Sequence, residues 1–173
     1  MTAIITALYF FLPAFAANMA PAIAAAFKLP AAEPLSEKQF GSHKTIRGLY
    51  AGYCAALLML WIQLLIQRNG SFEAYRLLDY TTLNLVWYAF LFGIGALGGD
   101  LLKSYFKRRL GIAPGRPWPV FDQLDFVVGG LVFVYLAYPF PLYVAVILLI
   151  ITPVLHLLTN VISYFLGLKE VWW

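Results

Sequence analysis

The chain has 173 residues, of which 62% are apolar and 12% charged, and its formal net charge is +4. An average globular domain has about 45–50% apolar and about 25% charged residues, so a water-soluble domain of this size could not bury the excess apolar surface. Disordered chains are poor in aromatic residues, and the 17% aromatic content excludes that class. The single cysteine, Cys54, excludes an internal disulfide and the CxxC and Cys/His metal motifs. The sequence therefore predicts an integral membrane protein.

Four stretches of the chain carry no charged residue and indicate the membrane spans. A helix needs about 20 apolar residues to cross a hydrocarbon core of about 30 Å. The first three stretches are each one helix long. The fourth, 126–168, is long enough for two helices, and Pro139 and Pro141 mark a turn near its middle. The sequence therefore predicts a single all-α membrane domain with five transmembrane helices. We expect the spans near 3–27, 48–67, 81–99, 123–139 and 142–166, and the main loops at 28–47 and 100–122.

Basic residues gather on one side of these predicted spans. The loops 28–47 and 100–122 and the C-terminal tail carry most of the Lys and Arg residues, whereas the few on the opposite side are balanced by acidic residues. Loops rich in Lys and Arg stay in the cytoplasm. We therefore expect a multi-pass protein of the cell membrane with its N-terminus outside and its C-terminus in the cytoplasm.

The second cytoplasmic loop and its flanks combine carboxylates with cations. If the third span continues as a helix to residue 110, one face of that helix carries an Asp, a Ser and two Lys side chains. These are Asp100, Lys103, Ser104 and Lys107. Asp122 and Asp125 are three residues apart, so they would share the first turn of the fourth span. Three carboxylates at one interface could hold a hard cation whose shell is completed by phosphate oxygens, an arrangement typical of phosphoryl or nucleotidyl transfer.

Each of these features also has an interpretation without catalysis. The basic run 107–109 could only set the topology and attract anionic lipid head groups, and Asp122 and Asp125 could only cap a helix. His156 and Asn160, four residues apart in the last span, could hydrogen-bond to another helix or serve a functional site. The alternative is therefore a non-catalytic membrane protein whose basic loops bind anionic lipids. A small transporter is disfavoured, because no inverted repeat is visible.

The block 99–125 resembles the CDP-archaeol synthase family and is similar to the signature of bacterial CDP-diacylglycerol synthases. The matching residues in this block are Gly99, Asp100, Lys103, Ser104, Lys107, Arg108 and Gly111, followed by Asp122 and Asp125. Weaker matches follow in the expected order elsewhere: Pro13, Ala14, Asn18 and Pro21, then Lys44, Thr45, Arg47 and Gly48, then His156, Asn160 and 166–169. The resemblance covers essentially the whole chain.

The resemblance implies a Mg²⁺-dependent membrane enzyme that transfers CMP from CTP to a lipid phosphate and releases pyrophosphate, giving a CDP-lipid for phospholipid synthesis. The lipid would be an archaeal ether lipid phosphate or phosphatidic acid. The expected metal ligands are Asp100, Asp122 and Asp125. The expected catalytic residues are Lys44, Arg47, Lys103 and Lys107, and the expected substrate-binding residues are Thr45, Ser104, Arg108, His156 and Asn160. The site would face the cytoplasm and bind no nucleic acid. The oligomeric state stays open, with a homodimer as one alternative.

Overall fold

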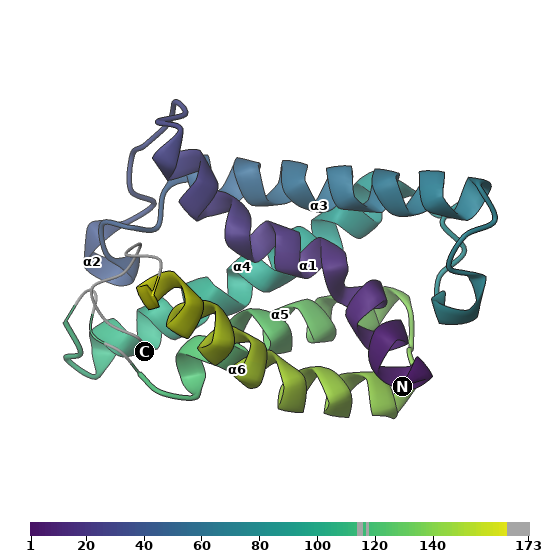
Figure 1. Ribbon diagram of the computed structural model, residues 1–173. Helices are drawn as coiled ribbons and strands as arrows, with labels where there is room; N and C mark the ends of the chain where they lie inside the picture. Colours follow the sequence, from purple (N-terminus) through teal and green to yellow (C-terminus); the bar gives the residue numbers. More distant parts are fainter. Residues whose placement is uncertain (114–115, 117, 166–173) are drawn as a thin grey trace.

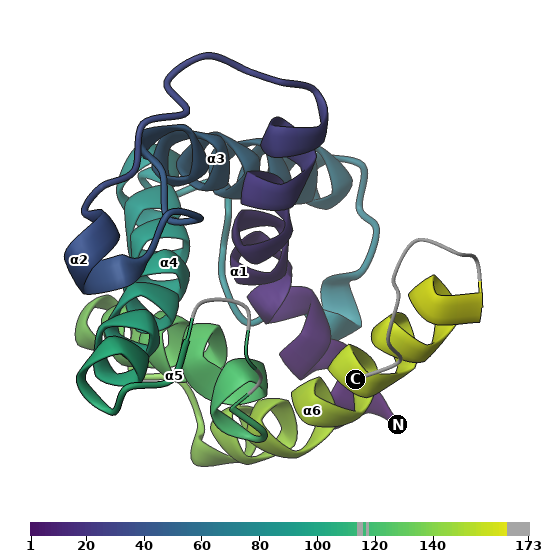
Figure 2. The ribbon, with the colours of Figure 1, turned by 90° about the vertical axis from the view of Figure 1, so that its left-hand side faces the viewer.

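The computed structural model describes residues 1–113, 116 and 118–165, and its regular structure there is helical. Long helices run side by side along the molecule and alternate in direction (Figures 1 and 2). They are α1 (Thr2–Ala26), α3 (Ile46–Arg68), α4 (Leu85–Arg109), α5 (Phe121–Ala137) and α6 (Leu142–Phe165). Two short elements lie in the connections, α2 (Glu37–Phe40) and the 3₁₀ helix η1 (Glu73–Tyr75). Each of the five predicted segments is thus helical.

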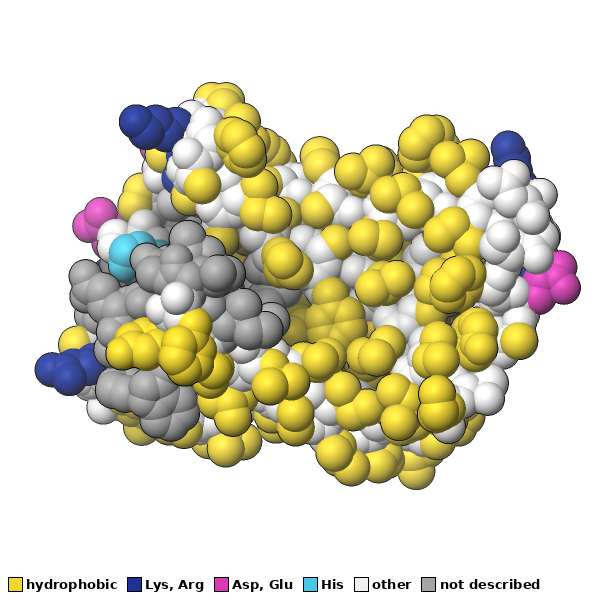
Figure 3. All heavy atoms as spheres, in the orientation of Figure 1, with side chains coloured by type: hydrophobic (Ala, Val, Ile, Leu, Met, Phe, Trp, Pro, Cys, Tyr) yellow, Lys and Arg dark blue, Asp and Glu magenta, His cyan; other side chains and the backbone are white. Residues whose placement is uncertain are grey.

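Membrane character follows from the length and composition of these helices. Among the described residues, α1, α3 and α4 are long and apolar enough to cross a membrane. The remaining two long helices are also apolar, but α5 has only 17 residues, somewhat fewer than the about 20 of a typical span. Apolar side chains cover the middle of the molecular face shown in Figure 3, whereas charged side chains appear toward its two ends. The number of spans and the side of each terminus stay predictions.

Local sequence signals set the helix ends. Asn84 begins α4 by accepting a hydrogen bond from the N–H of Trp87 at 3.1 Å. Gly111, with φ of +73°, follows α4 and supplies the left-handed backbone that ends it. Pro139 and Pro141 lie in the break between α5 and α6, as predicted. Helix α4 therefore runs past the predicted span into the basic segment.

The closest helix contact joins α4 to α5 through glycines. A β-carbon at Gly99 would overlap the carbonyl oxygen of Asp125, and one at Gly129 would overlap the carbonyl oxygen of Gly95. Small residues let membrane helices approach until their backbones touch. This contact sets the carboxyl-terminal part of α4 beside the first turns of α5, where the predicted metal ligands Asp100, Asp122 and Asp125 lie.

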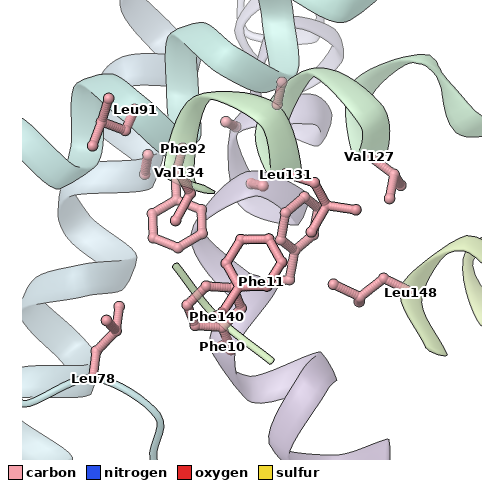
Figure 4. Close-up of a cluster of buried hydrophobic side chains, with 14 of the residues drawn as sticks. Phe10, Phe11, Leu78, Leu91, Phe92, Val127, Leu131, Val134, Phe140 and Leu148 are labelled. Atoms are coloured by element: carbon pink, nitrogen blue, oxygen red, sulfur yellow. The ribbon is translucent and has the colours of Figure 1, made fainter. Parts of the chain in front are cut away.

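Aromatic side chains fill the centre of the bundle. Phe10 and Phe11 of α1 are fully buried against Phe92 of α4, with ring centroids 5.4 and 6.1 Å apart. Figure 4 shows these rings beside Val134 of α5 and Leu148 of α6. The core thus connects α1, α4, α5 and α6, and the described polar side chains of Thr6, Gln63 and Thr152 are buried within the bundle as well.

Candidate active site

Lys103 of α4 lies at the centre of three aspartates. Its Nζ is 3.1 Å from Oδ1 of Asp100, 3.0 Å from Oδ1 of Asp122 and 2.5 Å from Oδ2 of Asp125. Asp100 is three residues before Lys103 on α4, whereas the other two aspartates come from the first turns of α5. The Lys103 side chain is 14% exposed, so this ion pairing takes place largely away from water. The structure thus joins the two motifs that the sequence separates by about twenty residues.

A second lysine reaches Asp100 from the first loop. Lys44 Nζ forms an ion pair with Oδ2 of Asp100. Lys44 is placed by the backbone, because its carbonyl accepts a hydrogen bond from Leu35 N at 2.7 Å, next to the bridge between Pro34 and Thr45. The loop before α3 is therefore folded back on itself, and its fold carries Lys44 to α4.

A third lysine holds the segment between α4 and α5. Lys107 Nζ donates to the Arg116 carbonyl at 2.6 Å and lies 3.1 and 3.2 Å from the two carboxylate oxygens of Asp122. The N–H of Trp118 donates to Oδ2 of Asp122 at 2.5 Å. Burial raises the pKa of Asp122, but the hydrogen bond from Trp118 and the Lys103 and Lys107 ammonium groups outweigh burial and lower it below its ordinary value. Asp122 is thus held as a carboxylate.

We name these six residues the acid–lysine cluster. Its members are Lys44, Lys103, Lys107, Asp100, Asp122 and Asp125. The three ammonium groups balance the three carboxylates, so each charge has an opposite partner. Removing a single partner from such a buried set leaves an uncompensated charge, which is strongly destabilising. An anionic ligand can therefore bind to the cluster only if it replaces aspartates as the partner of one or more lysines.

The carboxylates suit a magnesium ion by their donor chemistry. Oxygens of Asp100, Asp122 and Asp125 surround one point, and that point is held by the ammonium of Lys103. Within the described part of the chain, no three His, Cys, Asp or Glu side chains form a metal site by themselves. This arrangement fits Mg²⁺, which proteins usually hold through one or two carboxylates together with substrate phosphates. A cation at this point requires Lys103 to move aside.

Other predicted site residues near the cluster have partners of their own. Thr45 caps α3, since its Oγ1 accepts from Gly48 N at 3.2 Å. Arg47 donates from Nη1 to the Leu29 carbonyl at 2.8 Å, and Ser104 donates from Oγ to the Asp100 carbonyl at 2.9 Å. A small cavity of about 40 Å³, lined by Lys44, Thr45 and Asp100 among others, lies beside the cluster. Thr45 and Ser104 thus adjoin the cluster, whereas the Arg47 guanidinium is bound to the first loop.

Arg108 and His156 were also predicted to bind the substrate, and neither belongs to the six residues of the acid–lysine cluster. Arg108 has its Nε buried and without a hydrogen-bond partner in the described structure. His156 lines a groove with Asn18 and Phe126, in the part of the molecule where α1 and α6 meet. Asn160 lies on α6, and its side chain falls outside the described part of the structure. The structure therefore places His156 in the groove beside α1 and α6, and the role expected of Asn160 stays a prediction.

The sequence reasoning missed the groups that fix the cluster from outside it. The carbonyl of Arg116 and the N–H of Trp118 are backbone groups, so the residue type at these positions does not predict their role. The helix contact at Gly95 and Gly99 did leave a signal, because two glycines four residues apart are typical of close membrane-helix packing. That pattern could have predicted that another helix lies against the end of α4.

Comparisons with known proteins agree on one family. The model of the family described as CarS-like, CDP-archaeol synthase, matches residues 1–173. The CDP-archaeol synthase of Methanocaldococcus jannaschii is 41% identical over 135 residues, covering 77% of this chain and 75% of that protein. The CDP-archaeol synthase of Methanococcus maripaludis is 34% identical over 180 residues, covering 97% of this chain and 96% of that protein. A solved structure of an intramembrane enzyme for archaeal membrane lipids biosynthesis is 32% identical, with a TM-score of 0.70 over 89% of this chain and 92% of that one.

Proposed function

Since this chain belongs to the CDP-archaeol synthase family, we propose that it transfers CMP from CTP to a lipid phosphate within the membrane. The observation that carries the proposal is the acid–lysine cluster, in which carboxylates and lysines from α4, α5 and the first loop meet at one end of an apolar helix bundle. The curated relatives are CDP-archaeol synthases, which favours an archaeal ether lipid phosphate over phosphatidic acid as the acceptor.

The proposed reaction needs little acid or base catalysis. A phosphate monoester has its second pKa at about 6, so the lipid phosphate is largely a dianion at neutral pH. One of its oxygens attacks the α-phosphorus of CTP and forms the new P–O bond. The bond from that phosphorus to the oxygen bridging to the β-phosphate breaks, and pyrophosphate leaves with the electron pair. The protein therefore contributes mainly by positioning the reactants and by neutralising their charge.

The lysines of the cluster supply that neutralisation. Lys44 and Lys107 are the outer cations, each paired with an aspartate that Lys103 also contacts. When phosphate oxygens enter, they replace these aspartates as partners of the ammonium groups. Asp100, Asp122 and Asp125 would then hold Mg²⁺, which when bound neutralises charge on the phosphate oxygens. We place this end of the bundle in the cytoplasm, because the basic loops 28–47 and 100–122 are at this end and loops rich in Lys and Arg stay in the cytoplasm.

The same ion pairs argue against the non-catalytic alternative. A protein that only attracts anionic lipid head groups needs lysines that are free to face them. Lys44, Lys103 and Lys107 are instead each paired with aspartates, and Lys103 contacts three. Three partly buried carboxylates would weaken a surface meant only for anionic lipids, whereas an enzyme that binds a metal nucleotide has a use for them.

The test is a product assay with two lipids. Purified protein in detergent would be given Mg²⁺, CTP and either an unsaturated archaeal ether lipid phosphate or phosphatidic acid. Pyrophosphate release and CDP-lipid would be followed together, the latter by mass spectrometry. We expect CDP-lipid and pyrophosphate in equal amounts from the ether lipid phosphate, and neither product when CTP or the lipid is left out. Helical, monodisperse protein that forms no CDP-lipid from either lipid would contradict the proposal.

A further inference from the structure

A groove between α4 and α5 opens onto the acid–lysine cluster. Its volume is about 570 Å³, and apolar side chains of both helices line it, among them Leu102, Leu124 and Val128. Lys103 and Asp125 also line it, so the groove has a charged side and an apolar remainder. Its lining on α5 runs from Phe121 to Phe133, which corresponds to about 18 Å of helix.

Gly98 lines this groove and is not explained by helix packing. It lies within α4, where a glycine is less favourable than alanine by about 1 kcal/mol. Gly95, Gly99 and Gly129 are needed for the close approach of α4 to α5. At Gly98, by contrast, an added β-carbon would meet no atom within 4 Å, and the backbone has no positive φ. The absence of a side chain at this position leaves space in the groove, about 7.5 Å along the helix axis from Lys103.

Two other apolar grooves differ from this one in their lining. The groove between α1 and α3 has a volume of about 610 Å³, and the residues described along it are uncharged. The groove near α6 has a volume of about 380 Å³ and is lined by Asn18, Thr152 and His156 but by no described Lys, Asp or Glu. The α4–α5 groove thus combines a hydrocarbon surface with two residues of the cluster, Lys103 and Asp125, which suits an amphiphile with a phosphate at one end.

We propose that the α4–α5 groove binds a hydrocarbon chain of the lipid phosphate and that Gly98 keeps the groove open for it. The inference rests on the proposed function for the identity of the ligand. The phosphate lies toward Lys103, and the chain runs along α5 away from the cluster. A branched isoprenoid chain needs width as well as length, and a side chain at position 98 would reduce that width. Gly98 is therefore a specificity-determining residue and touches the tail rather than the reacting atoms.

The test fills the groove without disturbing the helix contact. Gly98→Leu projects a side chain into the groove, whereas Ala55→Leu adds the same side chain to the α1–α3 groove. We expect Gly98→Leu to raise the KM for the long-chain ether lipid phosphate by about tenfold or more, with KM for CTP unchanged. A lipid phosphate with short chains should be affected less, Gly98→Ala should fall between, and Ala55→Leu should match the wild type. An unchanged KM for the long-chain lipid in Gly98→Leu would overturn the proposal.

A binding measurement separates this proposal from the proposed function. An ether lipid phosphate that carries a photoreactive diazirine on its chain would be crosslinked to the wild-type protein, and the labelled peptides would be mapped by mass spectrometry. We expect labelling on α4 and α5 that an unlabelled lipid phosphate competes away and that Gly98→Leu reduces. Such labelling without any CDP-lipid formation would contradict the proposed function and leave the groove supported. If the active enzyme is labelled on other helices instead, and unlabelled lipid phosphate competes with that labelling, the proposal that the α4–α5 groove binds the chain is overturned.

Discussion

At the end of the bundle where α4 ends, three lysines pair with three aspartates; at the opposite end, Gln67 joins α3 to the following loop with an amide. Gln67 donates from Nε2 to Asp79 at 2.5 Å and accepts from Tyr80 N at 2.8 Å. Thr81 also donates to Asp79, through its hydroxyl at 2.6 Å. The hydrogen bonds to Asp79 from Thr81 and Gln67, led by the one from the Thr81 hydroxyl, lower the pKa of Asp79. The first end therefore depends on ion pairs and the second on hydrogen bonds within one connection.

The Gln67 end of the bundle has the interactions expected of a region that serves stability alone. A loop is held well enough by hydrogen bonds worth about 1 kcal/mol each, and these need no buried charge. Burying several charges is costly even when they are paired, and an apolar replacement is often more stable. The cluster nevertheless draws its charges from α4, α5 and the first loop. Such an arrangement is expected where charge is required for binding or chemistry.

The largest effect is expected at the centre of the cluster. Lys103→Met should lower kcat by about 100-fold or more, because it removes the cation that contacts all three aspartates. The matched control is Lys38→Met, which removes a lysine from the exposed surface of α2. Steady-state assays measure kcat for both variants after each is shown to be helical and monodisperse, and equal kcat of Lys103→Met and Lys38→Met would contradict the prediction.

The next effect concerns the glycine contact that brings α5 to the cluster. Gly129→Leu should lower the free energy of unfolding by about 1–3 kcal/mol, since its side chain would overlap the backbone of α4 at Gly95 and Gly99. Activity should fall with it, because the α5 aspartates would move away from Lys103. Gly98→Ala is the control on the facing helix and should unfold at the wild-type temperature or above. Thermal unfolding in detergent measures both, and similar midpoints would refute the packing explanation.

A smaller effect is expected at the opposite end. Gln67→Ala should lower stability by about 1–2 kcal/mol, since the amide bonds both to Asp79 and to the backbone of Tyr80. Its kcat and KM should stay at wild-type values, because this end takes no part in the reaction. Thermal unfolding and the lipid assay are measured on the same preparation. A loss of kcat without a loss of stability would remove the distinction between the two ends.

The smallest effect is expected at Thr45, which caps α3 beside the cluster. Thr45→Val should lower stability by about 1 kcal/mol, because the cap to Gly48 is lost. Thr45→Asn keeps a capping oxygen but no hydroxyl, so it distinguishes a structural role from the predicted substrate contact. Wild-type KM for CTP in Thr45→Asn supports a cap alone, and a raised KM supports the contact.

The sequence predicted the helices better than it predicted how they meet. Stretches without charge located all five long helices, because the membrane excludes charged side chains along most of a span. The spacing of Asp100, Lys103 and Lys107 also predicted one helix face, and α4 does extend to Arg109. The approach of Asp125 to Lys103 depends on the contact of Gly99 with α5, which is tertiary. The spacing of residues along the chain does not predict the distance between side chains on two different helices.

The first loop was harder to predict than the α4–α5 motif. Lys44 and Arg47 were predicted to be catalytic and Thr45 to bind the substrate, yet the three side chains have different surroundings in the structure. Lys44 pairs with Asp100, Thr45 caps α3, and Arg47 bonds to the Leu29 carbonyl. These surroundings follow from α2 and from the bridge between Pro34 and Thr45, neither of which has an apolar periodicity to reveal it. Irregular segments near a site therefore limit what a motif can predict.

The most direct test of the account compares one aspartate from each end. Asp122→Asn changes a carboxylate that contacts Lys103 and Lys107, and Asp79→Asn makes the same chemical change in the loop held by Gln67. The measurement is kcat for CDP-lipid formation from CTP and the ether lipid phosphate, in variants shown to be folded. We expect Asp122→Asn to lose turnover and Asp79→Asn to keep the wild-type value. Undiminished turnover in Asp122→Asn would contradict the claim that the acid–lysine cluster is the active site.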